Sequence, residues 1–519
     1  MRRRGLKILR VALAAVVFAG LAAAFLDFRG LVPAPLAHWL AAIQFVPALV
    51  VLATGGAAVA AVVIVVATLA FGRVYCAVVC PLGIAQDVIG WIARAFHLRR
   101  RLLPFARANN GLRYGVLVAT LATLAVGGAS IASSHTDPYS NFGRVVSGLF
   151  RPVIVAANNA LVTPATALGF AGLYRVNPPW PAPAILWPAL VVLVLVTALA
   201  VWRGRIYCNT LCPVGTVLGL MAGRSAFRLR LDRSACSKCA ECLRTCKAQC
   251  IDLRAGAIDA SRCVACYNCI DACAQHGIAY RWSWGRDTAG PVRVALPDLG
   301  RRAFLANGSV AIATAAGANR LLAGSGPGAD EGKSSRAICP PGAGGIDRFV
   351  ERCTACQLCV SACPTHVLQP ALGEYGFPGF MKPRLDYTAA FCNFDCQRCA
   401  EVCPAGAIAR QTLAAKQVTR IGLARLDLDQ CIVKTKGTDC AACSEHCPTK
   451  AVDTVPYGDG LRLPQVTDDL CIGCGACEYA CPALPHKAIK VTGRRWHEVA
   501  VKRMEGKARD PRKGGGFPF

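Results

Sequence analysis

Cysteine spacing constrains this chain more than any other feature of its sequence. Four segments repeat the spacing C-x2-C-x2-C-x3-C, and two further segments keep its last part, C-x2-C-x3-C, after a longer first interval. Three thiolates on a tight turn can bind three irons of one cubane, and the fourth cysteine of a run ligates a neighbouring cluster. Zinc sites rarely need this spacing, and disulfides do not require it. The pattern therefore predicts six [4Fe–4S] clusters.

The predicted ligands fall into six runs. The regular runs are Cys236, Cys239, Cys242, Cys246; Cys263, Cys266, Cys269, Cys273; Cys353, Cys356, Cys359, Cys363; and Cys471, Cys474, Cys477, Cys481. The altered runs are Cys392, Cys396, Cys399, Cys403 and Cys431, Cys440, Cys443, Cys447. Two cysteines, Cys250 and Cys339, are left over and are interpreted as spare thiols.

Fourth ligands exchange between paired clusters in ferredoxins of this type. In the first pair, we expect Cys273 to complete the Cys236 site and Cys246 to complete the Cys263 site. In the C-terminal half, we expect the two regular runs to pair with each other and the two altered runs to do the same. The expected exchanges there are Cys481 to the Cys353 site, Cys363 to the Cys471 site, Cys447 to the Cys392 site and Cys403 to the Cys431 site.

Part of the chain is predicted to lie in a membrane. Its hydrophobic fraction of 54% and mean hydropathy of +0.40 exceed those usual for a soluble protein. Four apolar stretches, 8–26, 47–71, 112–132 and 184–202, are long enough to cross a bilayer. Arginine and lysine cluster before the first stretch and after the second and fourth, which predicts four transmembrane helices with a cytoplasmic N-terminus.

The formal charge of +28 does not indicate a nucleic-acid partner. This count treats every cysteine as neutral, whereas an oxidised cluster with its four thiolates carries a charge of −2. Six clusters would offset about twelve positive charges. The remaining excess lies mostly in the membrane half, as expected for positively charged cytoplasmic flanks.

The membrane half contains an internal repeat. Gly72-Arg-Val-Tyr-Cys76 recurs as Gly204-Arg-Ile-Tyr-Cys208, and each copy is followed by a second Cys-Pro, at Cys80 and Cys212. Four thiols brought together at the cytoplasmic membrane face could bind a metal, exchange electrons or form disulfides. The alternative is that small cysteines and proline only shape the helix ends.

The segment that joins the halves contains Arg301-Arg302-Ala-Phe-Leu, an apolar run over 310–318 and a Gly/Ser-rich linker over 324–335. It resembles an internal twin-arginine export signal. Such signals export folded proteins, which suits a domain whose clusters are inserted in the cytoplasm. The alternative is a helix with a positive flank.

The electron donor is predicted to be a quinol, because the sequence contains no c-type haem, Rossmann or P-loop motif. His135 and Asp137, on a loop opposite the cytoplasmic face, could accept quinol protons, or they could be solvated loop residues. With two clusters inside and four outside, electrons would have to cross roughly 30 Å of hydrocarbon. Quinone itself or the C-x3-C-P thiols could carry them.

These motifs resemble a fusion of two ferredoxin-type proteins of periplasmic nitrate reductase systems. Residues 1 to about 290 resemble NapH, through the four helices, the paired C-x3-C-P motifs and the first two runs. Residues 300 to about 495 resemble NapG and MauM, through the twin-arginine motif, Pro340-Pro341-Gly342-Ala343 and the run from Cys471. Lys247 and Ala274 depart from the proline usual after a fourth cysteine.

The resemblance implies a quinol dehydrogenase subunit of the bacterial inner membrane. Its partners would be the membrane quinone pool and periplasmic redox proteins, either a cytochrome c or a molybdenum reductase such as nitrate reductase. Two alternatives remain: a membrane ferredoxin for metal handling, assembly or regulation, similar to CcoG or NosR, and a polyferredoxin that faces the cytoplasm throughout. With four methionines in the chain, a copper relay lacks its usual soft ligands.

We therefore expect an α-helical membrane domain joined to α+β dicluster-ferredoxin domains. The expected parts are a four-helix membrane domain over 1–230, a cytoplasmic two-cluster domain over 231–290, and a fifth signal or anchor segment with linker over 300–336. A periplasmic four-cluster domain over 337–495 and a basic tail over 496–519 follow.

Overall fold

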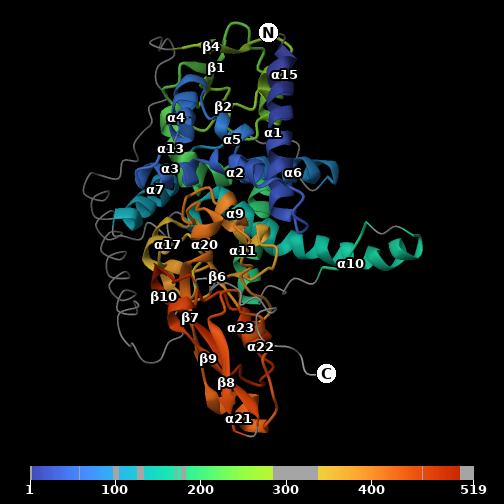
Figure 1. The fold of residues 1–519 in the computed structure, drawn as a ribbon. Coiled ribbons are helices and arrows are strands. Elements are labelled where there is room, and N and C mark those ends of the chain that lie inside the picture. Colours follow the sequence, from blue (N-terminus) through green and yellow to red (C-terminus); the bar gives the residue numbers. More distant parts are fainter. Residues whose placement is uncertain are drawn as a thin grey trace.

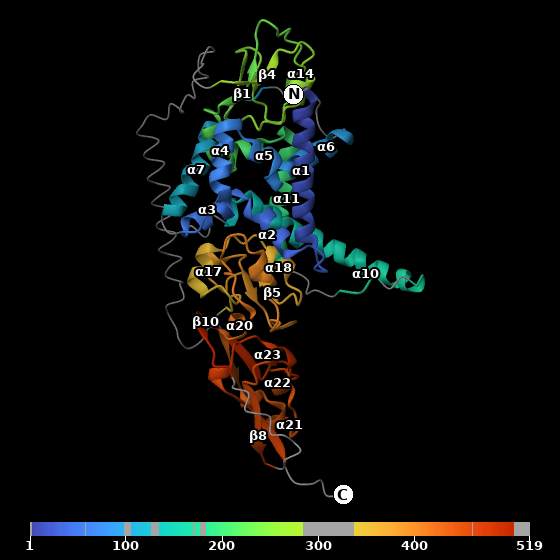
Figure 2. The same cartoon turned by 45° about the horizontal axis from the view of Figure 1, so that its top comes forward.

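The computed structural model describes residues 3–57, 59–97, 105–125, 134–169, 172–176, 183–283, 337–458 and 460–502. Its parts follow one another along one long axis (Figures 1 and 2). A layer of helices lies in the middle. A small ferredoxin unit, residues 227–282, covers the side where the chain's N-terminus lies, and residues 337–502 extend from the opposite side. The expected signal segment, with Arg301 and Arg302, lies outside the described residues.

The helical layer is built from two long helices, α1 and α11, and several shorter ones. In chain order its helices are α1 (Arg3–Leu26), α2 (Ala34–Ala42), α3 (Phe45–Ala53), α4 (Val59–Phe71), α5 (Val74–Val78), α6 (Pro81–Ala95), α7 (Asn110–Ala125), α9 (Pro138–Val145), a π-helical turn η1 (Val146–Phe150), α10 (Arg151–Ala167), α11 (Pro183–Arg203), α12 (Ile206–Thr210) and α13 (Pro213–Ala222). Pro81, Pro138 and Pro213 each begin a helix, where the missing N–H costs nothing.

The predicted spans match this layer only in part. Spans 8–26 and 184–202 lie within α1 and α11. The prediction of one continuous helix over 47–71 is wrong, because the helix is interrupted between α3 and α4, where Gly55 adopts a φ of 81°. The third predicted span, 112–132, begins in α7 and continues outside the described residues.

By length and composition, three helices in the described part of the chain could cross a membrane. They are Gly5–Leu26, Pro138–Ala167 and Leu186–Arg203, and the pair α2–α3, bent by 84°, would make a fourth if it forms one span. The stretch that includes α10 was not predicted. In Figures 1 and 2, α10 projects sideways from the other helices.

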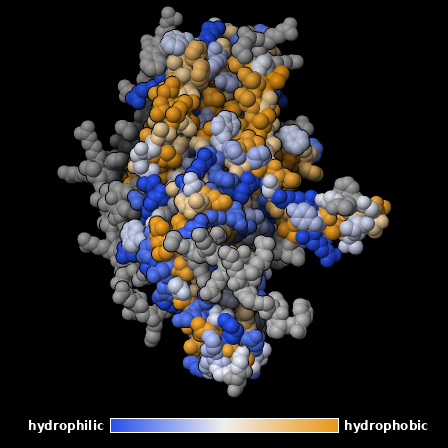
Figure 3. Space-filling model, in the orientation of Figure 1, coloured by the Kyte–Doolittle hydropathy of each residue, from blue (hydrophilic) through white to orange (hydrophobic). Residues whose placement is uncertain are grey.

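The outer surface of the helical layer is apolar. Val16, Val63 and Val191, on α1, α4 and α11, are each more than half exposed. Figure 3 shows hydrophobic residues spread over this part of the molecule, above a more hydrophilic region. So many exposed apolar side chains on one part of a protein mark a lipid or protein contact.

The ferredoxin unit at the N-terminal end has short elements around its cysteines. Strand β1 (Phe227–Leu231) pairs antiparallel with β4 (Ile278–Trp282), with Leu229 opposite Tyr280. A second small sheet joins β2 (Ile251–Asp252) to β3 (Ala257–Ile258), and each cysteine run ends in a one-turn helix, α14 (Glu241–Thr245) or α15 (Asn268–Ala272). β1 begins before residue 231, where we expected this domain to start.

The C-terminal region consists of two ferredoxin units arranged end to end (Figure 1). The first contains α17 (Ile346–Arg352), α18 (Leu358–Ala362), β5 (Leu368–Pro370), the 3-10 turn η2 (Phe377–Gly379), β6 (Pro383–Leu385), α19 (Arg398–Val402) and α20 (Leu413–Gln417). The second contains β7 (Thr419–Leu426), η3 (Leu428–Gln430), α21 (Ile432–Lys436), α22 (Ala442–Glu445), β8 (Val452–Tyr457), β9 (Leu461–Val466), η4 (Asp468–Leu470), α23 (Ala476–Ala480) and β10 (Ile489–Val499). All strand pairs are antiparallel: β5 with β6, β7 with β10 and β8 with β9. β10 ends beyond residue 495, within the expected basic tail.

Helix α1 links the two ferredoxin regions. Its first part contacts α15, where Lys7 forms an ion pair of 2.6 Å with Asp271, and its last part contacts α18. The 24 residues of α1 extend over about 36 Å, close to the thickness of a bilayer with part of its headgroups. The structure therefore separates the two ferredoxin regions by the thickness of the helical layer.

The C-terminal region packs directly on the helical layer. Arg398 donates a hydrogen bond to the Val32 carbonyl (3.1 Å), and Arg151 donates one to the Ser361 carbonyl (2.9 Å). Gly143 in α9 lies so close to Cys356 that a Cβ atom there would be 2.2 Å from the Cys356 oxygen. These contacts fix the C-terminal region against α2, α9 and α10.

Asp87 in α6 is the corresponding anchor on the N-terminal side. Its carboxylate forms ion pairs with Arg205 (2.8 Å), Lys247 (2.8 Å) and Arg10 (3.3 Å). Arg10 and Arg205 are buried, and Lys247 directly follows Cys246 in the ferredoxin unit. One carboxylate therefore joins α1, the second repeat and the ferredoxin unit.

Replacing Asp87 with asparagine should destabilise the protein by about 3–5 kcal/mol, because three largely buried cations lose their shared counter-ion. Thermal unfolding of the detergent-purified protein would show the loss as a lower midpoint. Asp429→Asn is the matched control, since Asp429 forms a 2.7 Å ion pair with Lys434 at an exposed site and no measurable change is expected. Equal midpoints for the two variants would contradict the anchoring role.

Candidate iron–sulfur sites and the membrane thiols

The four regular cysteine runs share an unusual backbone conformation. The second and fourth residues after the first cysteine adopt positive φ: Lys238 and Ala240, Ala265 and Tyr267, Ala355 and Gln357, Gly473 and Gly475. Residues other than glycine rarely adopt such angles, and the strain concentrates at functional sites. Positive φ at alternate residues can turn successive N–H groups toward one side and form an anion-binding concavity. The runs are therefore shaped to surround an anionic group such as a cluster.

The N-terminal ferredoxin unit brings its cysteines together as the predicted exchange requires. Cys246 lines a cavity of about 300 Å³ with the first three cysteines of the second run, Cys263, Cys266 and Cys269. Cys273 lies near the first run, where its charge adds to burial in raising the pKa of Cys242 to about 11. Each of the two sites therefore takes three thiols from one run and the fourth from the other.

In the C-terminal region the predicted pairing is wrong. Cys363 lines a cavity of about 360 Å³ with Cys392, Cys396 and Cys399, and Cys403 lies near Cys353, Cys356 and Cys359. Cys481 lines a cavity of about 330 Å³ with Cys431, Cys440 and Cys443, and Cys447 lies near Cys471, Cys474 and Cys477. Each regular run pairs with the altered run nearest to it in sequence, because both belong to one compact ferredoxin unit.

The cavities are chemically suited to iron–sulfur clusters. Burial raises the pKa of Cys356 to about 12 and those of Cys353 and Cys392 to about 11, so without metal these thiols stay protonated at neutral pH. A bound iron displaces the protons, because the thiolate is the ligand. All 30 cysteines are free thiols in the structure, which leaves every predicted ligand available.

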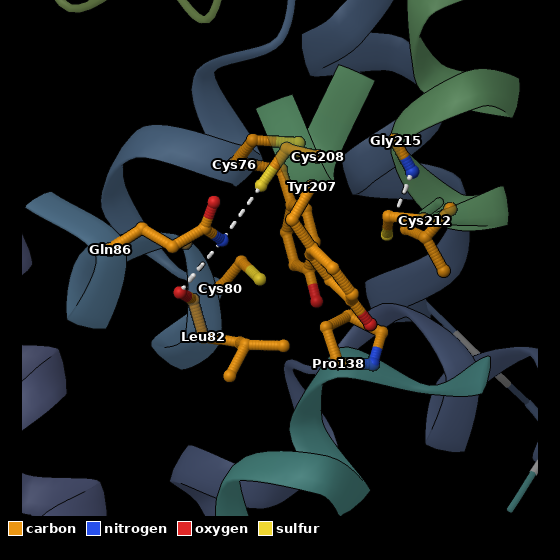
Figure 4. A pocket seen from close by; sticks show the side chains of 12 residues that line it. Cys76, Cys80, Leu82, Gln86, Pro138, Tyr207, Cys208, Cys212 and Gly215 are labelled. Carbon is orange, nitrogen blue, oxygen red and sulfur yellow. Dashed lines mark hydrogen bonds between the residues drawn. The ribbon is translucent and has the colours of Figure 1, made fainter. Parts of the chain in front are cut away.

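The four C-x3-C-P cysteines also meet in one cavity, of about 260 Å³. Figure 4 shows Cys76, Cys80, Cys208 and Cys212 around it, together with Tyr207, Pro138 and Gln86. All four thiols are buried. The structure places them inside the helical layer, where α9 closes the cavity on the side of the C-terminal region, and their position at the cytoplasmic membrane face stays a prediction. Sequence reasoning could not detect this closure.

His135 and Asp137 are not solvated loop residues. Asp137 is 1% exposed and caps α9, where its carboxylate accepts hydrogen bonds from the backbone N–H groups of Tyr139 and Ser140 and from the Ser140 hydroxyl. The His135 ring packs on Phe380 of the C-terminal region, 5.9 Å between ring centres, and its Nδ1 lies 3.3 Å from Arg144. The structure thus gives Asp137 a clear structural role, and proton transfer from quinol stays a prediction.

The two leftover cysteines are both in polar contacts that sequence reasoning missed. The Cys250 sulfur lies 3.8 Å from that of Cys246 and lowers its pKa, and Cys250 also lines the Cys263 cavity. The sequence did contain a sign of this role. Cys250 lies four residues after Cys246, the last cysteine of its run, whereas the equivalent position after Cys273 is Gly277. The Cys339 sulfur lies 3.1 Å from His497 Nε2 and lines none of the cavities described above, although the adjacent Pro340 lines the Cys363 cavity.

The corrected ligand exchange predicts a specific pattern of cluster loss. Cys363→Ser combined with Cys396→Ser should remove about four iron atoms per chain, because both thiols serve one cluster. Cys403→Ser combined with Cys396→Ser should remove about eight, because these thiols serve two. Iron analysis of the purified variants distinguishes the cases, and Cys339→Ser should leave the iron content unchanged. Equal loss from both double variants would restore the original pairing or indicate a further one.

Three protein-family models match parts of the chain, and two of them bear on the pairing of the cysteine runs. Residues 352–408 and 436–488 each match a 4Fe-4S dicluster domain, so the family boundaries pair the same runs as the structure. Residues 52–102 and 183–232 match a 4Fe-4S binding domain. This last match covers both C-x3-C-P motifs and ends before Cys236. No solved structure matches the chain.

Similar proteins cover both halves of the chain. The ferredoxin-type protein NapG of Escherichia coli is 34% identical over 219 residues, which are 38% of this chain and 88% of NapG. The methylamine utilization ferredoxin-type protein MauM of Methylorubrum extorquens is 35% identical over 170 residues, 31% of this chain and 74% of MauM. The ferredoxin-type protein NapH of Haemophilus influenzae is 28% identical over 226 residues, 42% of this chain and 64% of NapH.

The relatives, the cysteine runs and the helical layer lead to one conclusion. NapG-like and NapH-like pieces together fit a fusion, as the motifs predicted. The chain belongs to the family of NapG- and MauM-like ferredoxin-type iron–sulfur proteins, joined here to a NapH-like part.

Proposed function

We propose that this protein oxidises quinol in the bacterial inner membrane and passes the electrons to a periplasmic reductase such as nitrate reductase. One observation carries the proposal: cluster cavities lie at both ends of α1, and further buried cysteines lie between them. An arrangement of this kind suits electron transfer across a membrane. The likeness to NapG and NapH supports a partner in nitrate reduction.

The cysteine sites are arranged to hold their clusters in a row. When bound, [4Fe–4S] clusters supply one-electron oxidation and reduction at potentials that their surroundings tune. In the C-terminal region, the Cys392 N–H donates a hydrogen bond to the Cys474 carbonyl (3.0 Å), and the Tyr387 hydroxyl donates one to the Gly473 carbonyl (2.6 Å). These bonds connect the two ferredoxin units at the point where their sites approach each other.

Charged residues near the first C-terminal site would influence its potential. Lys382 is fully buried, and its amino group donates a hydrogen bond to the Val350 carbonyl. Burial lowers the pKa of Lys382 to about 8, and the nearby Cys353 opposes this shift. A positive charge beside Cys353 would favour the reduced, more negative form of a cluster held there. This site contacts the helical layer at Gly143, so Lys382 would help it accept electrons.

Positive charge is also consistent with the proposed orientation. The N-terminal ferredoxin unit lies at the end of α1 that carries Lys7 and Arg10, and the sequence before it is rich in arginine. By the positive-inside rule this end would face the cytoplasm. The C-terminal region, at the other end of α1, would then lie in the periplasm.

Anaerobically purified protein mixed with a soluble quinol analogue should develop the EPR signals of reduced [4Fe–4S] clusters, because quinol donates two electrons and two protons. The matching quinone, added in place of the quinol, should give no signal. If dithionite reduces the clusters and the quinol does not, the protein is not a quinol dehydrogenase, and an assembly or metal-handling role becomes the better explanation.

The orientation can be tested with a tag at Phe519. In cytoplasm-stripped inverted vesicles, the tag on the native chain should be protected from added protease, because the C-terminal region would lie inside the vesicle. Arg301→Lys combined with Arg302→Lys keeps the charge but removes the guanidinium groups, and should expose the tag. Digestion of the native tag would mean that both ferredoxin regions face the cytoplasm, and a periplasmic partner would be abandoned.

A further inference from the structure

We propose that Cys76, Cys80, Cys208 and Cys212 hold a seventh [4Fe–4S] cluster inside the helical layer, and that it connects the two ferredoxin regions. The inference deepens the proposed function and rests on it for the direction of electron flow. It assigns a ligand set, a cluster type and a place in the electron path to the two C-x3-C-P motifs.

The cavity resembles the ferredoxin cavities in size and lining. It measures about 260 Å³ with four cysteines, somewhat less than the about 300 Å³, 330 Å³ and 360 Å³ of the three ferredoxin cavities described above. Its remaining lining is aromatic, aliphatic or glycine, apart from Gln86, and contains no carboxylate or histidine. Thiolates alone select iron–sulfur clusters, zinc or Cu(I).

The spacing of the thiols favours a cluster over a single ion. A mononuclear zinc site needs its sulfur ligands about 2.3 Å from one point. No three His, Cys, Asp or Glu side chains converge in this way among the described residues. The same is true of the ferredoxin runs, whose thiols must surround a larger cubane. The membrane thiols and the ferredoxin thiols are therefore alike in that, among the described residues, neither set forms a single-ion site.

Buried positive charge at the cavity calls for an anion. Arg73 is 0% exposed, and among the residues that the structure describes no carboxylate lies within ion-pair distance of it. Its guanidinium donates to the Asn209 side chain (2.7 Å) and the Cys208 carbonyl (3.1 Å), and lies 3.9 Å from the Cys76 sulfur. An unpaired buried charge is costly. An oxidised cluster with four thiolates carries −2 and would compensate it.

The second repeat supplies a matching arginine. Arg205 is 1% exposed and donates a hydrogen bond to the Cys76 carbonyl, just as Arg73 donates to that of Cys208. Its carboxylate partner, Asp87, is shared with Lys247 and Arg10. Three cations and one anion leave this group positive as well. The two repeats thus place one arginine each across the cavity, on the carbonyl of the other repeat's first cysteine.

Hydrogen bonds to sulfur are already in place. The Gln86 side-chain amide donates to the Cys208 sulfur (3.1 Å), and the Gly215 N–H donates to the Cys212 sulfur (3.3 Å), as drawn in Figure 4. Such donors stabilise a reduced cluster and tune its potential. Glycine is required at position 215, because a Cβ atom there would lie 2.2 Å from the Cys208 oxygen. Gly83 is equivalent in the first repeat, with a distance of 2.6 Å to the Cys76 oxygen.

The cavity lies between the two ferredoxin regions. On one side, Asn209 donates to the Ala248 carbonyl (3.4 Å) and the Arg205 N–H donates to that of Lys247 (3.0 Å), two residues that follow the ligand Cys246. On the other side, Pro138 lines the cavity and begins α9, the helix whose Gly143 contacts Cys356. On each side, a short segment of chain therefore connects residues at the cavity with a predicted ligand of the nearest ferredoxin site, Cys246 or Cys356.

The proposed redox step is the transfer of one electron through the seventh cluster. The seventh cluster would gain one electron from a reduced cluster on the N-terminal side, which is oxidised, and lose one electron to a cluster on the C-terminal side, which is reduced. No bond forms or breaks, and no proton is required. Quinol is the source of the electrons in the proposed function, and the periplasmic acceptor removes them.

The test is metal analysis of the full-length protein, purified anaerobically in detergent. We expect about 28 iron and 28 sulfide per chain, against about 24 if only the six ferredoxin-type clusters are present. Cys76→Ser combined with Cys212→Ser should lower both values by about four and remove one EPR signal, while the other six clusters remain. Cys339→Ser, which changes a buried thiol outside the cavities, should keep the native values.

A second variant guards against misfolding. Cys80→Ser alone should leave the fold intact and alter one cluster's Mössbauer spectrum, because a hydroxyl is a poorer iron ligand than a thiolate. The inference is overturned if native protein and the double variant contain the same iron, near 24, or if about one zinc or copper per chain disappears instead. Failure of the quinol reduction with native iron near 28 would overturn the proposed donor and leave the seventh cluster in place.

Discussion

Each ferredoxin-type site needs a thiol from a neighbouring cysteine run, and the rest of the structure depends on this exchange. A run cannot complete its own site, so two runs must fold against each other before either cluster is fully held. The positive φ angles at Ala355 and Gln357 add local strain that a bound cluster would offset. Cluster insertion and folding would therefore be coupled in each ferredoxin unit, as they are in small metal-binding domains.

In the helical layer, too, two segments that are distant in sequence hold each other in place. Arg73 and Arg205 each reach across to the other repeat, and Asp87 ties the second repeat to α1 and to the ferredoxin unit. A buried guanidinium group is costly alone, and fixed hydrogen-bonding and charged partners offset that cost. The contacts of α1 with α18 and of α2 with α19 then hold the C-terminal region against the layer. Electrostatic contacts within the layer and close packing at its far side thus align all the cysteine sites.

Much of the site could be predicted from local sequence, because cluster ligation requires cysteines at fixed short spacings. The same spacing rule identified the exchange of Cys246 and Cys273 in the first unit. It misled in the C-terminal region, where we paired runs by regularity, while the chain pairs runs that are near in sequence. Runs that are close in sequence pair because each pair forms one compact unit with short connections. Irregular spacing changes only the loop between the cysteines.

Longer-range features escaped prediction. His135 resembled a loop residue because Phe380, on which its ring packs, is more than two hundred positions away in sequence. The break at Gly55 interrupts a stretch that hydropathy alone describes as continuous. The end-to-end order of the two C-terminal units also has a consequence for encounters with other proteins. The Cys431–Cys481 cavity lies beside α21, at the end of the molecule opposite the helical layer (Figure 1), so a soluble acceptor could dock there by free diffusion, from many directions, without displacing lipid headgroups.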